Sequence, residues 1–257
     1  ALKQAFGDIK MSAISKRMVQ EFHNDLRAKG YSNAYCNRYL QLLKSSYNTA
    51  INVLEIVDIK NPAVGIPLFE EHGRERYLVQ EELGRLMPVL MADDGMTAKI
   101  VRFLLATGLR LGECLNCRWK DIDLDNRVMV IPAVRAKSKR TDSIPLNAAA
   151  IQVLEECDHD TDWPFANPVT SKPFVSLKRS FQSIMKKASL DGVTAHTLRH
   201  TAASIMINSG RSLYDVQRVL RHSSSQVTEK YAHLSPKSAQ AASDVISDQL
   251  LKAAAGN

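Results

Sequence analysis

One short stretch, HTLRH at residues 196–200, combines side chains that could bind either a metal ion or an anion. His196 and His200 stand four residues apart, which places two side chains on one face of a helix and is the spacing of many zinc sites. Arg199 lies on the same turn, keeps its positive charge and offers only hydrogen-bond donors. The zinc motif also needs a glutamate directly after the first histidine, where this chain has Thr197. These differences favour an anion site.

Two further metal motifs are incomplete. Cys114 and Cys117 form a CxxC pair without a second pair at zinc-finger spacing, so we expect reduced thiols on an amphipathic helix. The acidic string Asp158, Asp160 and Asp162 starts like a calcium loop, but the glycine and the glutamate that should follow are missing. The phosphate-binding motif GxxxxGK[ST] does not occur in the sequence. We therefore expect chemistry that uses no metal, ATP or other cofactor.

Other side chains could bind or attack a phosphodiester. Arg110 stands at an expected helix start, where backbone N–H groups and the helix dipole favour an anion. Lys137 lies in the basic run RAKSKR at residues 135–140. His222 precedes SSSQ, which is typical of the cap of a helix that would carry Tyr231. Each residue alone has an ordinary structural explanation, so their order along the chain carries the information.

The composition indicates a soluble globular protein with a polyanionic partner. The 257 residues are 45% hydrophobic, enough for one large domain or two of moderate size. Thirty-four Lys and Arg against 27 Asp and Glu give a net charge of +7, which fits a nucleic acid. The chain has no run of about 18 to 20 apolar residues, and residues 1–10 lack a signal core. We expect a cytoplasmic protein without membrane association.

Hydrophobic periodicity predicts a mainly α-helical chain with a small three-stranded antiparallel sheet, divided into two domains. Residues 1–60 predict a helical domain with helices at 12–29 and 32–54. Residues 61–76, rich in Pro, Gly and charge, predict an interdomain linker. Residues 77–257 predict a mixed α/β domain whose sheet lies between residues 119 and 146. Its expected helices lie at 79–92, 96–106, 147–157, 174–188, 196–209, 212–221, 224–232 and 238–253.

The runs ATGLRLGE, AKSKRTDSIPL, HTLRHTAAS and VLRHSSSQVTEKYAHL together resemble the tyrosine recombinase family, which includes phage integrases. The resemblance covers residues 77–240 and implies a catalytic domain there, preceded by a helical core-binding domain. It implies catalytic roles for Arg110, Lys137, His196, Arg199, His222 and Tyr231, and supporting roles for Glu113 and His200. Arg221 departs from the pattern, since many members have glycine there, and this puts the local turn in question.

The resemblance implies a specific chemistry. Tyr231 would attack a scissile phosphodiester to give a 3′-phosphotyrosine and a free 5′-hydroxyl, which keeps the phosphoester energy in a covalent bond. Arg110 and Arg199 would hold the non-bridging oxygens and stabilise the charge of the transition state. Lys137 would protonate the departing 5′-oxygen, and His196 would accept the tyrosine proton.

A basic surface and several partners are also expected. Residues 178–221 carry eight Lys and Arg against two Asp, which favours contact with a DNA backbone. The expected DNA contacts are Arg135, Lys139, Arg140, Lys178, Arg179 and Arg221. The resemblance implies that the partner is double-stranded DNA at specific attachment sites and that the protein acts as a homo-tetramer on synapsed DNA. Accessory DNA-bending proteins are compatible with this activity. The resemblance also implies that the reaction takes place in the cytoplasm of a bacterial host. Residues 235–257 predict a helix that docks on its own domain or on a neighbouring subunit.

The main hypothesis is a site-specific DNA recombinase, the integrase of a phage or other mobile element. A type IB topoisomerase, which shares the catalytic residue types but relaxes supercoils without exchanging partners, is the nearest enzymatic alternative. A DNA-binding module without cleavage activity is the alternative from another class. The complete set of catalytic positions argues against such a module.

Overall fold

The computed structural model describes residues 1–56, 58–71, 76–134 and 141–221. Contacts between residues divide the chain into two compact units, Ala1–Arg74 (unit 1) and Glu75–Asn257 (unit 2). The helices predicted at 224–232 and 238–253, and with them the docking of the C-terminal helix, lie outside the described residues. Within the described ranges, no helix is both long enough and apolar enough to cross a membrane.

Unit 1 is helical and contains α1 (Leu2–Phe6), the 3-10 turn η1 (Met11–Ala13), α2 (Lys16–Ala28) and α3 (Asn33–Asn52). The hydroxyl of Ser32 caps α3 by accepting a hydrogen bond from the Tyr35 N–H at 3.3 Å. Gly30, which follows α2, has φ 82, a left-handed conformation that favours glycine. The two helices predicted for this part are confirmed, with slightly shorter bounds.

The segment predicted as an interdomain linker, residues 61–76, belongs mostly to unit 1. Ile66 is buried in the unit 1 core. Asn37 of α3 holds the backbone of Phe69 from both sides: its Oδ1 accepts the Phe69 N–H at 2.9 Å, and its Nδ2 donates to the Phe69 carbonyl at 2.8 Å. The boundary between the units therefore follows Arg74, not residue 60. The proline and glycine content of residues 61–76 predicts an irregular backbone. Composition alone does not show whether such a backbone packs against the neighbouring helices.

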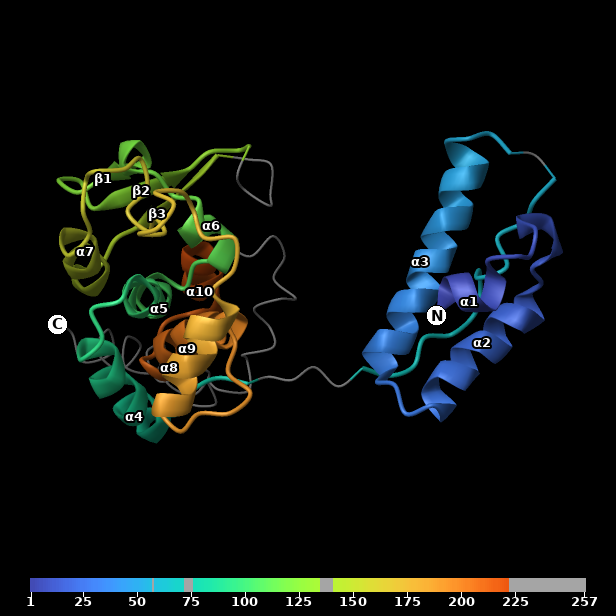
Figure 1. Ribbon diagram of the computed structural model, residues 1–257, viewed down its shortest axis with the longest axis horizontal. Coiled ribbons are helices and arrows are strands. Elements are labelled where there is room, and N and C mark those ends of the chain that lie inside the picture. Colours follow the sequence, from blue (N-terminus) through green and yellow to red (C-terminus); the bar gives the residue numbers. More distant parts are fainter. Residues whose placement is uncertain (57, 72–75, 135–140, 222–257) are drawn as a thin grey trace, which may run out of the picture. The chain divides into compact units, whose positions relative to one another are not determined.

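Unit 2 is built around one central helix, α5 (Met96–Thr107) (Figure 1). This helix contacts α4, α6, α7, α8 and α9. Ile100, Phe103 and Leu104 of α5 are almost completely buried. The surrounding helices are α4 (Gln80–Met91), α6 (Leu111–Leu115), α7 (Ala148–Glu155), α8 (Lys178–Lys187), α9 (Ala195–Asn208) and α10 (Leu213–Leu220). Every helix predicted within the described part of this unit is present.

The sheet of unit 2 has three antiparallel strands in the order β1-β2-β3, as predicted. After the 3-10 turn η2 (Trp119–Asp121) the strands are β1 (Ile122–Asp123), β2 (Val128–Ile131) and β3 (Asp142–Pro145). Met129 lies opposite Ile144, and both side chains are buried in the unit 2 core. The fold is thus mainly α with a small antiparallel sheet.

Candidate functional site

The turn between α5 and α6 begins the site. Gly108 ends α5 in the left-handed conformation, with φ 63 and ψ 17. A Cβ at this position would lie 2.4 Å from Leu220 Cδ2 and 3.3 Å from Ala202 Cβ. Backbone conformation and lack of space therefore both require glycine. The tight turn delivers the chain directly to Arg110.

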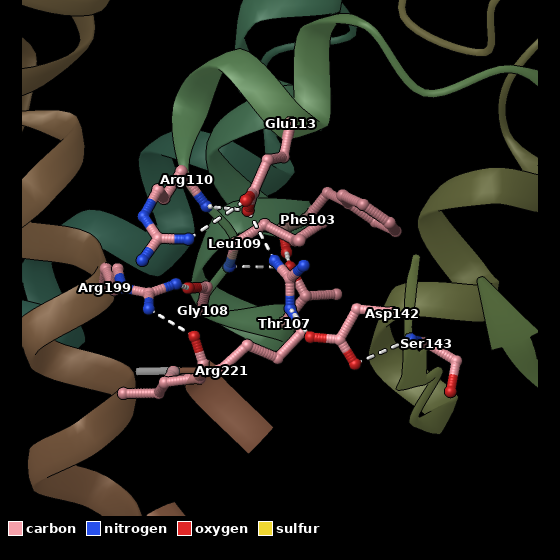
Figure 2. A network of polar contacts seen from close by, with 11 residues as sticks. Phe103, Thr107, Gly108, Leu109, Arg110, Glu113, Asp142, Ser143, Arg199 and Arg221 are labelled. Carbon is pink, nitrogen blue, oxygen red and sulfur yellow. Dashed lines mark hydrogen bonds and ion pairs between the residues drawn. The ribbon is translucent and has the colours of Figure 1, made fainter. Parts of the chain in front are cut away.

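Arg110 is the N-cap residue of α6, where the sequence predicted a helix start. Glu113 accepts the Arg110 backbone N–H through Oε2 at 3.2 Å and the side-chain Nη1 through Oε1 at 3.0 Å (Figure 2). The Glu113 side chain is 5% exposed, whereas that of Arg110 is 33% exposed. The buried Glu113 carboxylate is thus paired with a guanidinium that solvent can reach.

Arg199 of α9 lies buried beside the same turn and is 3% exposed. Its Nη1 donates to the Gly108 carbonyl at 2.6 Å (Figure 2), and its Nη2 donates to the Leu220 carbonyl. Gly108 is the C-cap of α5, and Leu220 is the last residue of α10. The negative ends of two helix dipoles thus face this guanidinium, which helps to stabilise its buried positive charge.

Arg221 brings a third guanidinium to the site. It is the C-cap of α10, with φ 54 and ψ 51. Its Nη2 donates to Glu113 Oε2 at 2.5 Å, and its Nε lies 3.9 Å from Asp142 Oδ2 on β3. The left-handed turn that the sequence left in question is therefore formed with arginine in it. Only 7% of the Arg221 side chain is exposed, and its guanidinium is paired with Glu113. A DNA phosphate would have to compete with Glu113 for this guanidinium.

Glu113 is a buried carboxylate shared by two arginines. Burial alone raises the pKa of Glu113, but the charges of Arg221 and Arg110 and the Arg110 N–H together bring that pKa below its ordinary value. The carboxylate is therefore ionised at neutral pH. The guanidinium groups of Arg110, Arg199 and Arg221 outnumber the carboxylates of Glu113 and Asp142, which leaves the site with an excess of positive charge, as an anion site requires.

The two histidines of the HTLRH stretch contact each other on α9. The rings of His196 and His200 have centroids 4.4 Å apart and planes at 81°, an edge-to-face arrangement. His196 is exposed, His200 is half-buried and Arg199 is buried, so the predicted pair of His196 and Arg199 occupies two different environments. Among the described residues, no group of three or more His, Cys, Asp or Glu is placed to hold a metal ion.

The cysteine pair also lies close to the site in sequence. Cys114 and Cys117 are buried as free thiols, and burial raises the pKa of Cys114 well above its ordinary value. The prediction that both lie on one helix is wrong, because α6 ends at Leu115. A buried neutral thiol is a poor nucleophile and a poor metal ligand.

Several predicted residues fall outside the described ranges. They are the catalytic candidates Lys137, His222 and Tyr231 and the DNA-contact candidates Arg135, Lys139 and Arg140. Lys178 and Arg179 are exposed at the start of α8, where a DNA backbone could reach them.

Sequence reasoning missed three partners in the site: the carbonyls of Gly108 and Leu220 and the carboxylate of Asp142. Main-chain carbonyls carry no signal in the residue types. Asp142 is the first residue of β3, and nothing in its residue type or position in the sequence indicates an ion pair. Only the glycine at residue 108 hinted that two segments of chain approach closely there.

The fold of the chain is similar to that of DNA-bound integrases. The Tn1549 transposon integrase in complex with circular intermediate DNA has a TM-score of 0.73 at 21% identity, over 93% of this chain and 88% of that one. A lambda integrase dimer bound to a core site has a TM-score of 0.73 at 18% identity, over 90% and 83% of the two chains. At these identities the likeness concerns the fold.

A family model described as the phage integrase family matches residues 76–238, and the chain belongs to this family. The resemblance seen in the motifs is therefore confirmed. The integrase of Escherichia phage P2 is 27% identical over 87% of this chain and 62% of its own length. The integrase of Salmonella phage P22 is 26% identical over 77% and 53%. Tyrosine recombinase XerC of Chlamydia pneumoniae is 26% identical over 91% and 78%. The chain thus spans just over half of the length of the two phage integrases.

Proposed function

We propose that the protein is a site-specific DNA recombinase, the integrase of a phage or other mobile element. It cleaves and rejoins DNA through a 3′-phosphotyrosine intermediate. The observation that carries this proposal is the cluster of Arg110, Glu113 and Arg199 around the Gly108 turn, in a chain of the phage integrase family. Relatives named integrase and tyrosine recombinase support the same activity.

The two arginines act differently on the scissile phosphate. Arg110 meets a non-bridging oxygen from the solvent side, since a third of its side chain is exposed. Arg199 supplies a fixed charge from within the protein, where the lower dielectric strengthens its attraction to the negative charge of the transition state. Glu113 and two carbonyls hold these guanidinium groups before DNA arrives, so little reorganisation is needed during the reaction.

The bond changes follow from the family motifs. Tyr231 Oη forms a bond to phosphorus as its proton passes to His196, and the bond from phosphorus to the 5′-oxygen breaks. Lys137 gives a proton to that oxygen, and His222 donates a hydrogen bond to the phosphate. Attack by another 5′-hydroxyl reverses the steps and joins a new strand. Both transesterifications conserve the number of phosphoester bonds, so no ATP or metal is required.

The DNA partner is double-stranded DNA with specific attachment sites. Unit 1, with nine Lys and Arg against five Asp and Glu over residues 1–60, is a core-binding domain in this proposal, and Lys178 and Arg179 of unit 2 contact the backbone. A homo-tetramer on synapsed DNA completes the reaction in the cytoplasm of a bacterial host. Support comes from a lambda integrase tetramer bound to a Holliday junction, which has a TM-score of 0.70 to this chain.

A nicked suicide substrate made from the ends of the element tests the proposal. The wild-type protein should form a covalent adduct, with or without EDTA, and Tyr231→Phe should bind the same DNA and form none. An adduct with Tyr231→Phe would remove that residue from its role. A wild-type protein that binds but never cleaves would favour a DNA-binding module, and relaxation of supercoils without any defined site would favour a type IB topoisomerase.

A further inference from the structure

We propose that Arg221 is a positioning residue that orients Arg110 for phosphate binding by holding Glu113. The proposal rests on the proposed function, because it names what fixes one of the two phosphate-binding arginines. Arg221 is not among the positions to which the motif comparison gave a catalytic role.

The carboxylate of Glu113 is held at both of its oxygens. Oε1 accepts Arg110 Nη1 at 3.0 Å, while Oε2 accepts Arg221 Nη2 at 2.5 Å and the Arg110 backbone N–H at 3.2 Å (Figure 2). Loss of Arg221 would leave Oε2 with the longer backbone bond alone. The carboxylate could then turn about its last side-chain bond, and the guanidinium of Arg110 would lose a fixed partner.

Arg221 is the more deeply buried of the two partners of this carboxylate. Its side chain is 7% exposed, against 33% for Arg110. Solvent weakens an ion pair much less when both groups are buried, so the pair of Arg221 and Glu113 is the firmer one. Asp142 Oδ2, 3.9 Å from Arg221 Nε, faces the same guanidinium from β3. Arg221 therefore fixes the Glu113 carboxylate, which the more exposed Arg110 alone would hold less firmly.

The backbone at Arg221 gives a second, independent argument. Its φ of 54 is uncommon for a residue other than glycine and carries a conformational cost that glycine would avoid. An arginine in such a turn is therefore expected to contribute through its side chain. The adjacent Leu220 carbonyl accepts a hydrogen bond from Arg199. Residues 220–221 thus hold Arg199 through the main chain and Arg110 through the Arg221 side chain.

Cleavage rates of single-turnover reactions on the suicide substrate, with enzyme in saturating excess, test the proposal. Arg221→Met should lower the cleavage rate by about 10- to 100-fold, the order expected when a catalytic group loses its fixed geometry, and leave the DNA dissociation constant nearly unchanged. Arg221→Gly should lose a similar factor even though glycine relaxes the turn, and it serves if the methionine variant does not fold. Arg221→Lys should recover part of the rate.

Arg102→Met is a matched control, because Arg102 forms a two-bond ion pair with Glu156 in the same unit and its side chain is 10% exposed. It should lose stability without losing the saturated cleavage rate. The double variant Arg221→Met with Glu113→Gln should cleave no more slowly than Glu113→Gln alone, since Arg221 acts through Glu113.

Three results would overturn the proposal. They are a wild-type cleavage rate for the methionine and glycine variants, an equal loss in Arg102→Met, and weaker DNA binding with an unchanged saturated rate, which would make Arg221 a DNA contact. A wild-type protein without adduct would overturn the proposed function and this proposal together. Normal cleavage by the Arg221 variants would overturn this proposal alone.

Discussion

Arg199 Nη1 donates a hydrogen bond of 2.6 Å to the carbonyl oxygen of Gly108, a residue 91 positions earlier in the chain. This bond joins α9 to the turn that precedes Arg110. A Cβ at residue 108 would lie 2.4 Å from Leu220 Cδ2, so the two phosphate-binding arginines of the proposed mechanism depend on one closely packed turn. Changes at this turn should therefore affect stability and cleavage together.

Gly108→Ala should destabilise unit 2. The new Cβ would meet Leu220 Cδ2 at 2.4 Å in a backbone with φ 63. Strain and overpacking together should lower the free energy of unfolding by about 2 to 4 kcal/mol. Urea unfolding followed by tryptophan fluorescence measures this, because both tryptophans, Trp119 and Trp163, lie in unit 2. Gly112→Ala is the control, since nothing lies within 4 Å of its added Cβ. An equal effect of both substitutions would contradict the argument.

Glu113→Gln should reduce stability in a pH-dependent way. The folded-state pKa of Glu113 lies below its ordinary value of 4.5, so its charge stabilises the folded state fully above that pH. Breaking a buried pair should cost about 3 kcal/mol at pH 7. The difference between wild type and variant should shrink as the pH falls below 4.5 towards the lower folded-state value. Urea unfolding between pH 7 and 3 measures this difference, and a difference that grows in acid would contradict this assignment.

Helix ends and turns in both units could be predicted from the sequence because their signals are local. Ser32 and Gly30 mark helix ends by their own conformational preferences, and Gly108 marks a left-handed turn in the same way. Alternation of apolar residues likewise predicts the three strands, since each strand exposes one face.

Tertiary contacts could not be predicted in this way. Residues 61–76 are predicted to be a linker because proline and glycine indicate only the shape of the backbone. The hydrogen bonds that fix this segment join Phe69 to Asn37, which lies more than 30 residues earlier in the chain. Arg221 is predicted to be a DNA contact for the same reason, because the orientation of its side chain depends on Glu113, 108 positions earlier. Charge type alone does not distinguish a buried ion pair from a DNA contact.

Arg199→Lys should abolish most cleavage without preventing DNA binding. A lysine ammonium keeps the charge but lacks the planar fork that bonds two carbonyls at once, so the ends of α5 and α10 lose their bridge. The cleavage rate should fall by about 100-fold or more. Arg211→Lys is the control, because Arg211 is exposed and lies within the same basic stretch, residues 178–221. Single-turnover cleavage near the wild-type rate in Arg199→Lys would contradict the role of this fork.

Lys178→Gln and Arg179→Gln should weaken DNA binding through the loss of backbone contacts. Each change should reduce the slope of log K against log salt concentration by about 1, and should affect specific and unrelated DNA alike. Lys120→Gln, an exposed lysine outside residues 178–221, is the control. Titrations at several salt concentrations measure the slopes. Unchanged slopes for both α8 variants would place the DNA elsewhere on unit 2.

The chemical structure of the covalent intermediate shows directly whether Tyr231 is the nucleophile. The adduct formed on a suicide substrate can be digested with nuclease and trypsin, and the peptide that carries the nucleotide can be identified by mass spectrometry. Trypsin cuts after Lys230 and Lys237, so we expect a nucleotide joined through its 3′-phosphate to residues 231–237, at Tyr231. A nucleotide joined to any other residue, or joined through a 5′-phosphate, would contradict it.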